Sequence, residues 1–326
     1  MNIIAYRLPN NPKIYIYEVS KAQEINVQSQ SHSLKFVVSG FNNTHIFNEY
    51  RCFNTLSDIP QTILFQNNLS KSFIEFEKHQ YYDYINQIKN FINGSLTNKI
   101  VASRRMTVPF SKDINDLFFD LCNIYNDAFI FFLSTEELGT WIGASPELLL
   151  ERQGSKLTTM SLAGTRSLSC SKSWDKKNIK EQKIVTDYLI DIFDRFRLNP
   201  SIINQGTKQA GNIEHLMTII EGKTVDNFNL ISLLKALSPT PALSGFPKKE
   251  AIEIINNFEG DRSLYGGFMG PVFPNGDFRF NVILRCACLS PTTATLFAGG
   301  GITYLSDPEE EWEETEKKLE TIRRLL

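Results

Sequence analysis

The chain has 326 residues, of which 42% are hydrophobic, and its formal net charge is -2. This length allows one large domain or two ordinary ones with a substantial core. The lack of excess basic charge argues against a nucleic-acid-binding function, and no apolar run approaches the roughly 18 residues of a membrane span. Arg7 and two prolines occupy the N-terminus where a signal peptide needs an apolar segment, so we expect a cytoplasmic protein.

The cysteines indicate a reducing compartment as well. Their number is odd, and no CxxC pair occurs. Two of them, Cys286 and Cys288, would point the same way from one strand, which is poor disulfide geometry. We therefore expect free thiols at all five positions, which are Cys52, Cys122, Cys170, Cys286 and Cys288.

Apolar residues at helical spacing predict helices over residues 81–92, 113–125 and 178–196. Asp307 is a suitable N-cap and Pro308 a suitable first residue for a last helix near the C-terminus. Residues 1 to 75 mix short strand-like runs with turns rich in asparagine and serine.

Strand-like runs occupy residues 99–104, 128–165, 268–273, 278–289 and 293–301. They interleave with the helices without a regular βαβ rhythm, and the chain contains no GxGxxG or Walker A loop. The sequence therefore predicts an α+β fold with an extensive, largely antiparallel sheet.

Three carboxylates lie beside seams that we expect to be buried. Glu181 is followed three and four residues later by Ile184 and Val185, and Glu311 and Glu314 share one face of the last helix. A buried unpaired carboxylate is costly, and a hard cation such as Mg²⁺ is a suitable partner. Alternatively, the glutamates of the last helix only complement its dipole.

Four further polar residues could carry chemistry. Lys99 begins a strand-like run, and it could act as a base or be a solvated lysine at a strand end. Glu147 follows a turn-rich break and is flanked by apolar residues, so it could be a protonated acid or part of an ion pair at a strand edge. Arg285 lies within an apolar strand and needs an anion such as a carboxylate, whereas His215 alone is typical of a structural histidine.

The glycine run Gly299–Gly301 ends the last predicted strand and precedes the last helix. Its N–H groups could hold a carboxylate, because glycine permits close backbone approach. The alternative is a tight bend.

A series of short segments resembles, in order, the family of chorismate-binding enzymes from about residue 80 onwards. The segments are KIVASR, GASPELLL, AGTR, KEQKIV, SPTPALSGFPK, YGGFMG, VILRCA and AGGGI followed by SDPEEEWEETEKK. The resemblance implies a single domain over residues 1–326, with a divergent part at 1–79 and a family-like catalytic part at 80–326. The implied fold is a large, mostly antiparallel β-sandwich flanked by helices.

The resemblance also implies roles for individual residues. Lys99 corresponds to a lysine that activates water, and Glu147 corresponds to the general acid. The implied Mg²⁺ ligands are Glu181 and Glu314, with Glu311 in or near that shell. The implied substrate-binding positions are His215, Ala242, Leu243, Arg285, Gly300 and Gly301.

Ala242 in the segment PTPALSG resembles the isochorismate synthase branch, since anthranilate and salicylate synthases usually have threonine there. The implied reaction converts the small molecule chorismate to isochorismate, by attack of water at C2 and loss of the C4 hydroxyl, for menaquinone or siderophore biosynthesis. The alternatives are a salicylate synthase, a large subunit of anthranilate or aminodeoxychorismate synthase, and a catalytically silent chorismate-binding protein. We expect a monomer without an amidotransferase subunit.

Several positions depart from the family pattern. Gln182 and Ser238 each replace a common histidine, Pro271 stands where tryptophan is frequent, and the glycine run reads GGG where GAG is usual. None of these changes removes a predicted catalytic or metal-binding residue.

Overall fold

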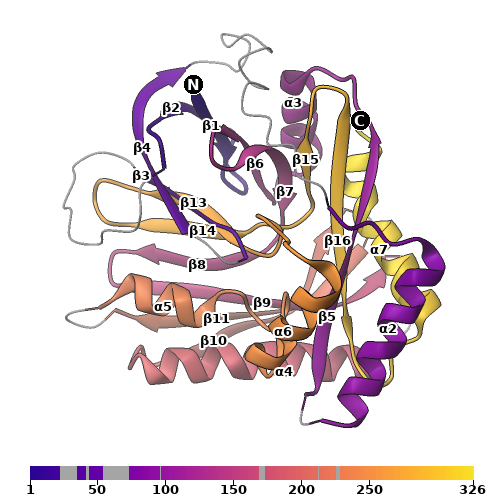
Figure 1. Ribbon diagram of the computed structural model, residues 1–326. Coiled ribbons are helices and arrows are strands. Elements are labelled where there is room, and N and C mark those ends of the chain that lie inside the picture. Colours follow the sequence, from indigo (N-terminus) through magenta and orange to yellow (C-terminus); the bar gives the residue numbers. More distant parts are fainter. Residues whose placement is uncertain are drawn as a thin grey trace.

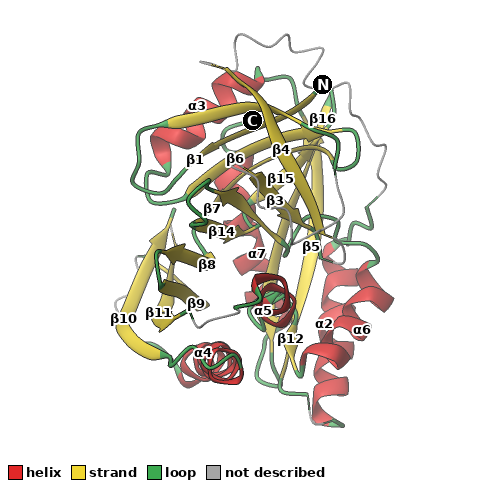
Figure 2. Cartoon of the chain, turned by 90° about the vertical axis from the view of Figure 1, so that its left-hand side faces the viewer, coloured by secondary structure: helices red, strands yellow, loops and turns green. Residues whose placement is uncertain are grey.

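The computed structural model describes residues 1–22, 35–41, 44–53, 73–95, 97–168, 173–211, 213–224 and 228–326. In this part of the chain, a 16-stranded antiparallel sheet carries helices on its outer faces (Figures 1 and 2). The predicted α+β class with a large antiparallel sheet is confirmed.

The strands are β1 (Asn2–Arg7), β2 (Ile14–Val19), β3 (Lys35–Ser39), β4 (Thr44–Phe53), β5 (Lys99–Pro109), β6 (Phe129–Thr135), β7 (Gly139–Ser145), β8 (Leu148–Gln153), β9 (Lys156–Ser167), β10 (Ser201–Ala210), β11 (Ile213–Lys223), β12 (Gly245–Phe246), β13 (Phe268–Val272), β14 (Phe278–Val282), β15 (Cys286–Leu289) and β16 (Thr293–Ile302). The described helices are α2 (Lys78–Asn93), α3 (Ile114–Ile124), α4 (Lys176–Arg195), α5 (Leu230–Leu237), α6 (Lys248–Glu259) and α7 (Pro308–Arg323).

The sheet folds over on itself. Its strand order is β10-β11-β9-β8-β14-β13-β3-β4-β2-β1-β6-β7-β15-β16-β5-β12, so β1 to β4 connect its two halves. One buried cluster contains Tyr6, Phe129 and Phe297 from one half together with Phe36 and Met269 from the other. The two halves therefore pack face to face as a sandwich.

Helices cover the outer faces of both halves. Helices α3 and α7 share a core with β6, β15 and β16, whereas α4 and α5 pack on β8, β9, β11 and β14. On α4 the inward residues include Val185, Leu189 and Phe193, and each side chain so buried contributes about 1.5–3 kcal/mol. Helices α2 and α7 lie side by side near β5 and β16 (Figure 1).

The predicted helices α2, α3, α4 and α7 are confirmed to within a few residues at each end, and Asp307 caps α7 as expected. The expected single strand over residues 278–289 is wrong, because β14 ends before Arg285, whose φ of 47° is incompatible with an extended strand. The strand predicted over residues 293–301 is confirmed as β16, and it contains the glycine run. The alternative of a tight bend is wrong, because Gly299–Gly301 pair with β5.

The cysteine prediction holds where it can be checked. The described cysteines, Cys52, Cys122, Cys286 and Cys288, are all free thiols. Cys170 lies outside the described residues. None of the helices in the described part of the chain is both long and apolar enough to cross a membrane.

Candidate active site

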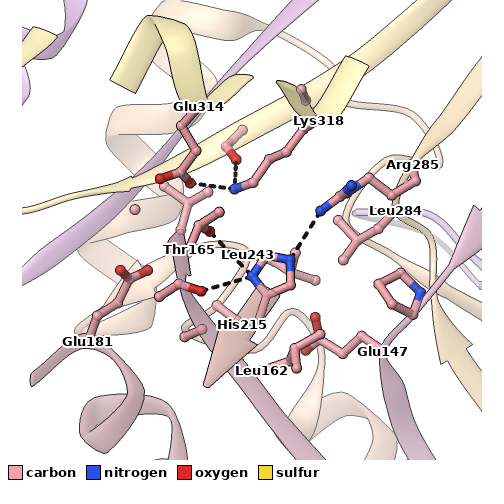
Figure 3. A pocket seen from close by; sticks show the side chains of 18 of the residues that line it. Glu147, Leu162, Thr165, Glu181, His215, Leu243, Leu284, Arg285, Glu314 and Lys318 are labelled. Atoms are coloured by element: carbon pink, nitrogen blue, oxygen red, sulfur yellow. Dashed lines mark hydrogen bonds and ion pairs between the residues drawn. The ribbon is translucent and has the colours of Figure 1, made fainter. Parts of the chain in front are cut away.

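A cavity of about 60 Å³ lies where both halves of the sheet meet α4 and α7 (Figure 3). Eight of the eleven predicted site residues line it, namely Glu147, Glu181, His215, Ala242, Leu243, Arg285, Gly301 and Glu314. The other three lie directly behind this wall. Lys99 pairs with Glu181, and Gly300 lies beside the carboxylates of Glu311 and Glu314. Residues far apart in the sequence thus converge on one site.

Glu147 lies in the connection between β7 and β8. The backbone of this connection is fixed by hydrogen bonds that Val282 N and Asn281 Nδ2 donate to Glu147 O, at 3.1 and 3.0 Å. Among the described residues, Glu147 Oε1 has no hydrogen-bond partner and the carboxyl makes no ion pair. Burial raises the pKa of Glu147 to about 8, against the lowering influence of Lys99 and Lys318. The group is therefore mostly protonated at neutral pH and can donate a proton.

Lys99 is fully buried at the start of β5, so the alternative of a solvated lysine is wrong. Its Nζ lies 2.7 Å from Oε1 of Glu181 on α4. A Cβ at Gly301 would lie 2.2 Å from that same oxygen and 2.7 Å from Lys99 Cε. Only glycine at this position leaves room for the pair.

Glu311 and Glu314 approach the same strand from α7. Glu311 Oε1 accepts a hydrogen bond from Lys177, whereas Oε2 has no partner in the described part of the chain and would lie 2.7 Å from a Cβ at Gly300. Burial and the neighbouring Glu314 raise the pKa of Glu311 to about 7. Burial also acts to raise the pKa of Glu314, but Lys318 and Lys177 bring it below its usual range.

Each of these three carboxylates is paired with a lysine. The pairs are Lys99–Glu181, Lys177–Glu311 and Lys318–Glu314. In this ion-paired arrangement, no group of three or more histidine, cysteine or acidic side chains in the described residues is positioned to hold a metal.

The donor set nevertheless fits Mg²⁺. All the donors are carboxylate oxygens, which this hard cation prefers. The buried Oε2 of Glu311 has no partner among the described residues, and the glycines of β16 leave space beside it. An ion placed there would satisfy an oxygen that is otherwise costly to bury.

His215 on β11 orients Arg285. Its Nδ1 lies 2.8 Å from Gly164 O, which can only accept, so Nδ1 carries the proton and Nε2 accepts from Arg285 Nη2 at 3.1 Å. Burial, with Arg285 and Lys318 nearby, lowers the pKa of His215 to about 3, so the ring is neutral.

Arg285 also donates from Nη1 to Thr321 Oγ1 at 3.0 Å. Burial lowers its pKa to about 10, which leaves it charged at neutral pH. No carboxylate among the described residues pairs with it. The guanidinium is therefore held by two neutral groups and is available to an anion.

The sequence reasoning missed Lys318 and Tyr265, which also line the cavity. Lys318 Nζ donates to Glu314 Oε1 at 2.6 Å and to Gly299 O at 2.8 Å. A signal was present, because Lys318 is four residues after Glu314 and shares its helix face. Tyr265 stands in one of the recognised segments, but nothing in its pattern assigned it a role.

The unusual Gln182 does not line this cavity. Its Nε2 donates to Ser161 Oγ at 2.8 Å and to Thr218 Oγ1 at 3.2 Å, and neither of these residues lines the cavity. This departure from the family pattern therefore changes packing behind Glu181 rather than the cavity wall.

A family model described as chorismate binding enzyme matches residues 12–324. The chain is 34% identical over 201 residues to isochorismate synthase EntC of Escherichia coli (strain K12), covering 56% of this chain and 50% of that protein. It is 31% identical over 263 residues to the vibriobactin-specific isochorismate synthase of Vibrio cholerae serotype O1, covering 74% of this chain and 65% of that protein. The chain thus spans half to two thirds of the length of these relatives.

A solved structure has a similar fold. It is a Bacillus anthracis protein, DhbC, described as a 2,3-dihydroxybenzoate-specific isochorismate synthase. The two structures align with a TM-score of 0.81 at 25% sequence identity, covering 99% of this chain and 95% of that chain.

Proposed function

Because the chain belongs to the chorismate-binding enzyme family, we propose that it is an isochorismate synthase that isomerises chorismate with the help of Mg²⁺. The observation that carries the proposal is one pocket that combines a buried, mostly protonated Glu147 with a buried Lys99. Such a pair provides an acid and a base for one substrate.

Chorismate is a dianion, and cationic groups in the pocket suit it. Arg285 has no carboxylate partner among the described residues, and its planar guanidinium can bind a carboxylate in two places. Lys318 lines the same cavity from α7. We assign to these two residues the anchoring of the substrate carboxylates, with Ala242, Leu243 and the glycines of β16 shaping the space around the ring.

The proton transfers follow from where the acid and the base lie. In Figure 3, Glu181 and Glu147 stand on opposite sides of the cavity, and Lys99 is bound to Glu181. On the side of Glu181, Lys99 would first have to lose the proton of its ammonium group to Glu181 or to water. Its neutral amine would then take a proton from the water whose oxygen bonds to C2. The ring double bonds would then shift and the C4–O bond would break, with Glu147 protonating the departing hydroxyl. One water is consumed and one is released, so the reaction is an isomerisation.

Glu181, Glu311 and Glu314 are the residues that would hold Mg²⁺. The ion would supply positive charge beside the ring carboxylate and so favour attack at C2. Glycine at positions 300 and 301 keeps the space between these carboxylates open, because a Cβ at either position would clash with a carboxylate oxygen.

The remaining parts of the proposal rest on the sequence and on the resemblance. They are a monomeric, cytoplasmic enzyme that needs no amidotransferase subunit. The proposed product would enter siderophore or menaquinone biosynthesis; similar proteins include a vibriobactin-specific isochorismate synthase and an isochorismate synthase MenF.

Product analysis tests the proposal. The full chain would be incubated with chorismate and MgCl₂, and the products separated by liquid chromatography, with Glu147→Gln as the inactive control. Isochorismate alone is expected. Salicylate with pyruvate would identify a salicylate synthase, an aminated product formed with ammonium would identify an anthranilate-type enzyme, and unchanged but bound chorismate would identify a silent protein.

A further inference from the structure

Lys177 differs from the other two lysines that pair with the site carboxylates. It is near the N-terminal end of α4 and reaches Glu311 on α7. Its side chain is 21% exposed, whereas that of Glu311 is 1% exposed. Lys177 also lines a second cavity of about 200 Å³, whose wall shares Thr165 and Glu314 with the active-site cavity. It therefore stands between solvent and the carboxylates.

The partner of Lys177 is incompletely satisfied. One oxygen of Glu311 accepts from Lys177, and the other has no hydrogen-bond partner among the described residues although the side chain is almost fully buried. Lys177 and the Ser306 hydroxyl both stabilise this carboxylate, but one buried oxygen still lacks a hydrogen bond, which is costly. The free oxygen lies beside Gly300, where a Cβ would come within 2.7 Å of it, so only glycine leaves this oxygen uncovered.

Charge balance requires an exchange when a divalent cation enters. Three ammonium groups already neutralise three carboxylates. Two of these ammonium groups are held in place, since Lys99 is fully buried and Lys318 also donates to Gly299 O. Among the described residues, Lys177 makes its hydrogen bond and ion pair with Glu311, and its side chain is the most exposed of the three lysines, at 21%. It is the ammonium that costs least to displace.

We propose that Lys177 is a built-in competitor of the metal: its ammonium occupies Glu311 in the metal-free protein and must leave before Mg²⁺ binds. This inference rests on the proposed function, because it assumes that Glu311 belongs to the magnesium site. Lys177 would then determine the magnesium concentration that is needed to occupy the site.

Titration calorimetry of MgCl₂ into the full chain without substrate tests this role. Lys177→Met keeps most of the aliphatic stem and removes the charge. We expect it to bind Mg²⁺ at least about tenfold more tightly than the wild type, the equivalent of 1.4 kcal/mol. Lys317→Met is the matched control, because Lys317 lines the same outer cavity but makes no ion pair in the described residues. Its loss should change the affinity by less than about threefold, since exposed charges are screened.

A second measurement separates competition from a folding defect. Thermal unfolding with and without MgCl₂ should show a larger stabilisation by the ion in Lys177→Met than in the wild type. Lys177→Arg should retain the weaker, wild-type response.

Equal magnesium affinities in Lys177→Met and Lys317→Met would overturn the inference, and so would weaker binding in Lys177→Met. In either case the product assay tests the proposed function independently of Lys177. If the wild type still makes isochorismate in a magnesium-dependent reaction, only the role of Lys177 is lost. If no variant binds Mg²⁺ and chorismate is unchanged, both proposals fail.

Discussion

Lys99 Nζ and Glu181 Oε1 lie 2.7 Å apart at a point where the lysine is fully buried and the glutamate side chain is 11% exposed. The pair joins the first residue of β5 to α4 across the glycine run of β16. The proposed base and a proposed metal ligand therefore form one ion pair. A substitution of either residue removes the partner of the other.

The first prediction concerns Lys99 as the base. Lys99→Met should lower kcat by about 10²–10⁴, the range that a positioned base contributes. The methionine fills the space of the stem, so the far-ultraviolet circular dichroism spectrum should be unchanged. Steady-state rates of isochorismate formation provide the measurement, with Lys317→Met as a charge-loss control that keeps its activity. Wild-type turnover in Lys99→Met would rule out this base.

The second prediction concerns the pH dependence set by Glu147. Burial raises the pKa of this group to about 8, and only its protonated form can act as the acid. The value of kcat/KM, which reports the free enzyme, should therefore fall above about pH 8 by roughly tenfold per pH unit. A profile without this basic limb would contradict the assignment of the acid.

Stability gives an independent test of the same carboxyl group. The folded state keeps the Glu147 proton up to about pH 8, whereas the unfolded chain loses it near its ordinary value of 4.5. Between these limits the folded state binds one more proton, so this group makes the free energy of unfolding fall as pH rises. Glu147→Gln should remove that part of the decline, as measured by urea unfolding at several pH values.

The third prediction concerns Glu314. Glu314→Gln should weaken Mg²⁺ binding by at least about tenfold, because a hard cation loses a charged oxygen ligand. The magnesium concentration for half-maximal rate should rise in parallel. Glu313→Gln is the control, because Glu313 is the preceding residue and lines only the outer cavity. An unchanged magnesium titration in Glu314→Gln would show that the ion lies elsewhere.

Elements with a strong periodic pattern were predictable from the sequence. Helix α7 is an example, since Asp307 and Pro308 mark its start and charged and apolar residues alternate along it with helical spacing. In contrast, β10 was not predicted, because its residues 201–207 are exposed on both faces and lack the alternation of a half-buried strand. Strand β11 was also missed, although buried and less buried residues alternate along much of it. The interruption between β14 and β15 at Arg285 could not be predicted either, because a non-glycine residue gives no sequence signal for a positive φ.

The site was predictable only in part. Individual site residues could be named because a series of segments resembled a family. The sequence around several of them, however, was compatible with both a functional and a purely structural role. The burial of Lys99 and the absence of an ion pair at Glu147 decide two of those alternatives, and both depend on contacts between distant parts of the chain. The lysine partner of Glu311 was missed because Lys177 lies on another helix and the sequence does not reveal that it reaches Glu311. The partner of Glu314, in contrast, was overlooked although Lys318 follows it by four residues.

The last prediction concerns Thr321, a positioning residue on α7. Its hydroxyl accepts a hydrogen bond from Arg285 Nη1 at 3.0 Å, and His215 fixes the other end of the guanidinium. Thr321→Val keeps the shape and removes only the hydroxyl. A hydrogen bond to a charged group contributes about 1.5–3 kcal/mol, so Arg285 should lose much of its orientation toward the substrate carboxylate.

If Arg285 binds the ground state and the transition state equally, KM for chorismate should rise about tenfold in Thr321→Val while kcat changes little. Thr321→Ser should restore the wild-type KM. The matched control is Thr315→Val, because Thr315 on the same helix accepts from Arg104 Nε at 2.7 Å, and Arg104 does not line the cavity. Both variants lose a buried hydrogen bond and should unfold at lower temperature, but only Thr321→Val should alter KM. The same KM in both variants would show that Arg285 does not depend on Thr321 for its position.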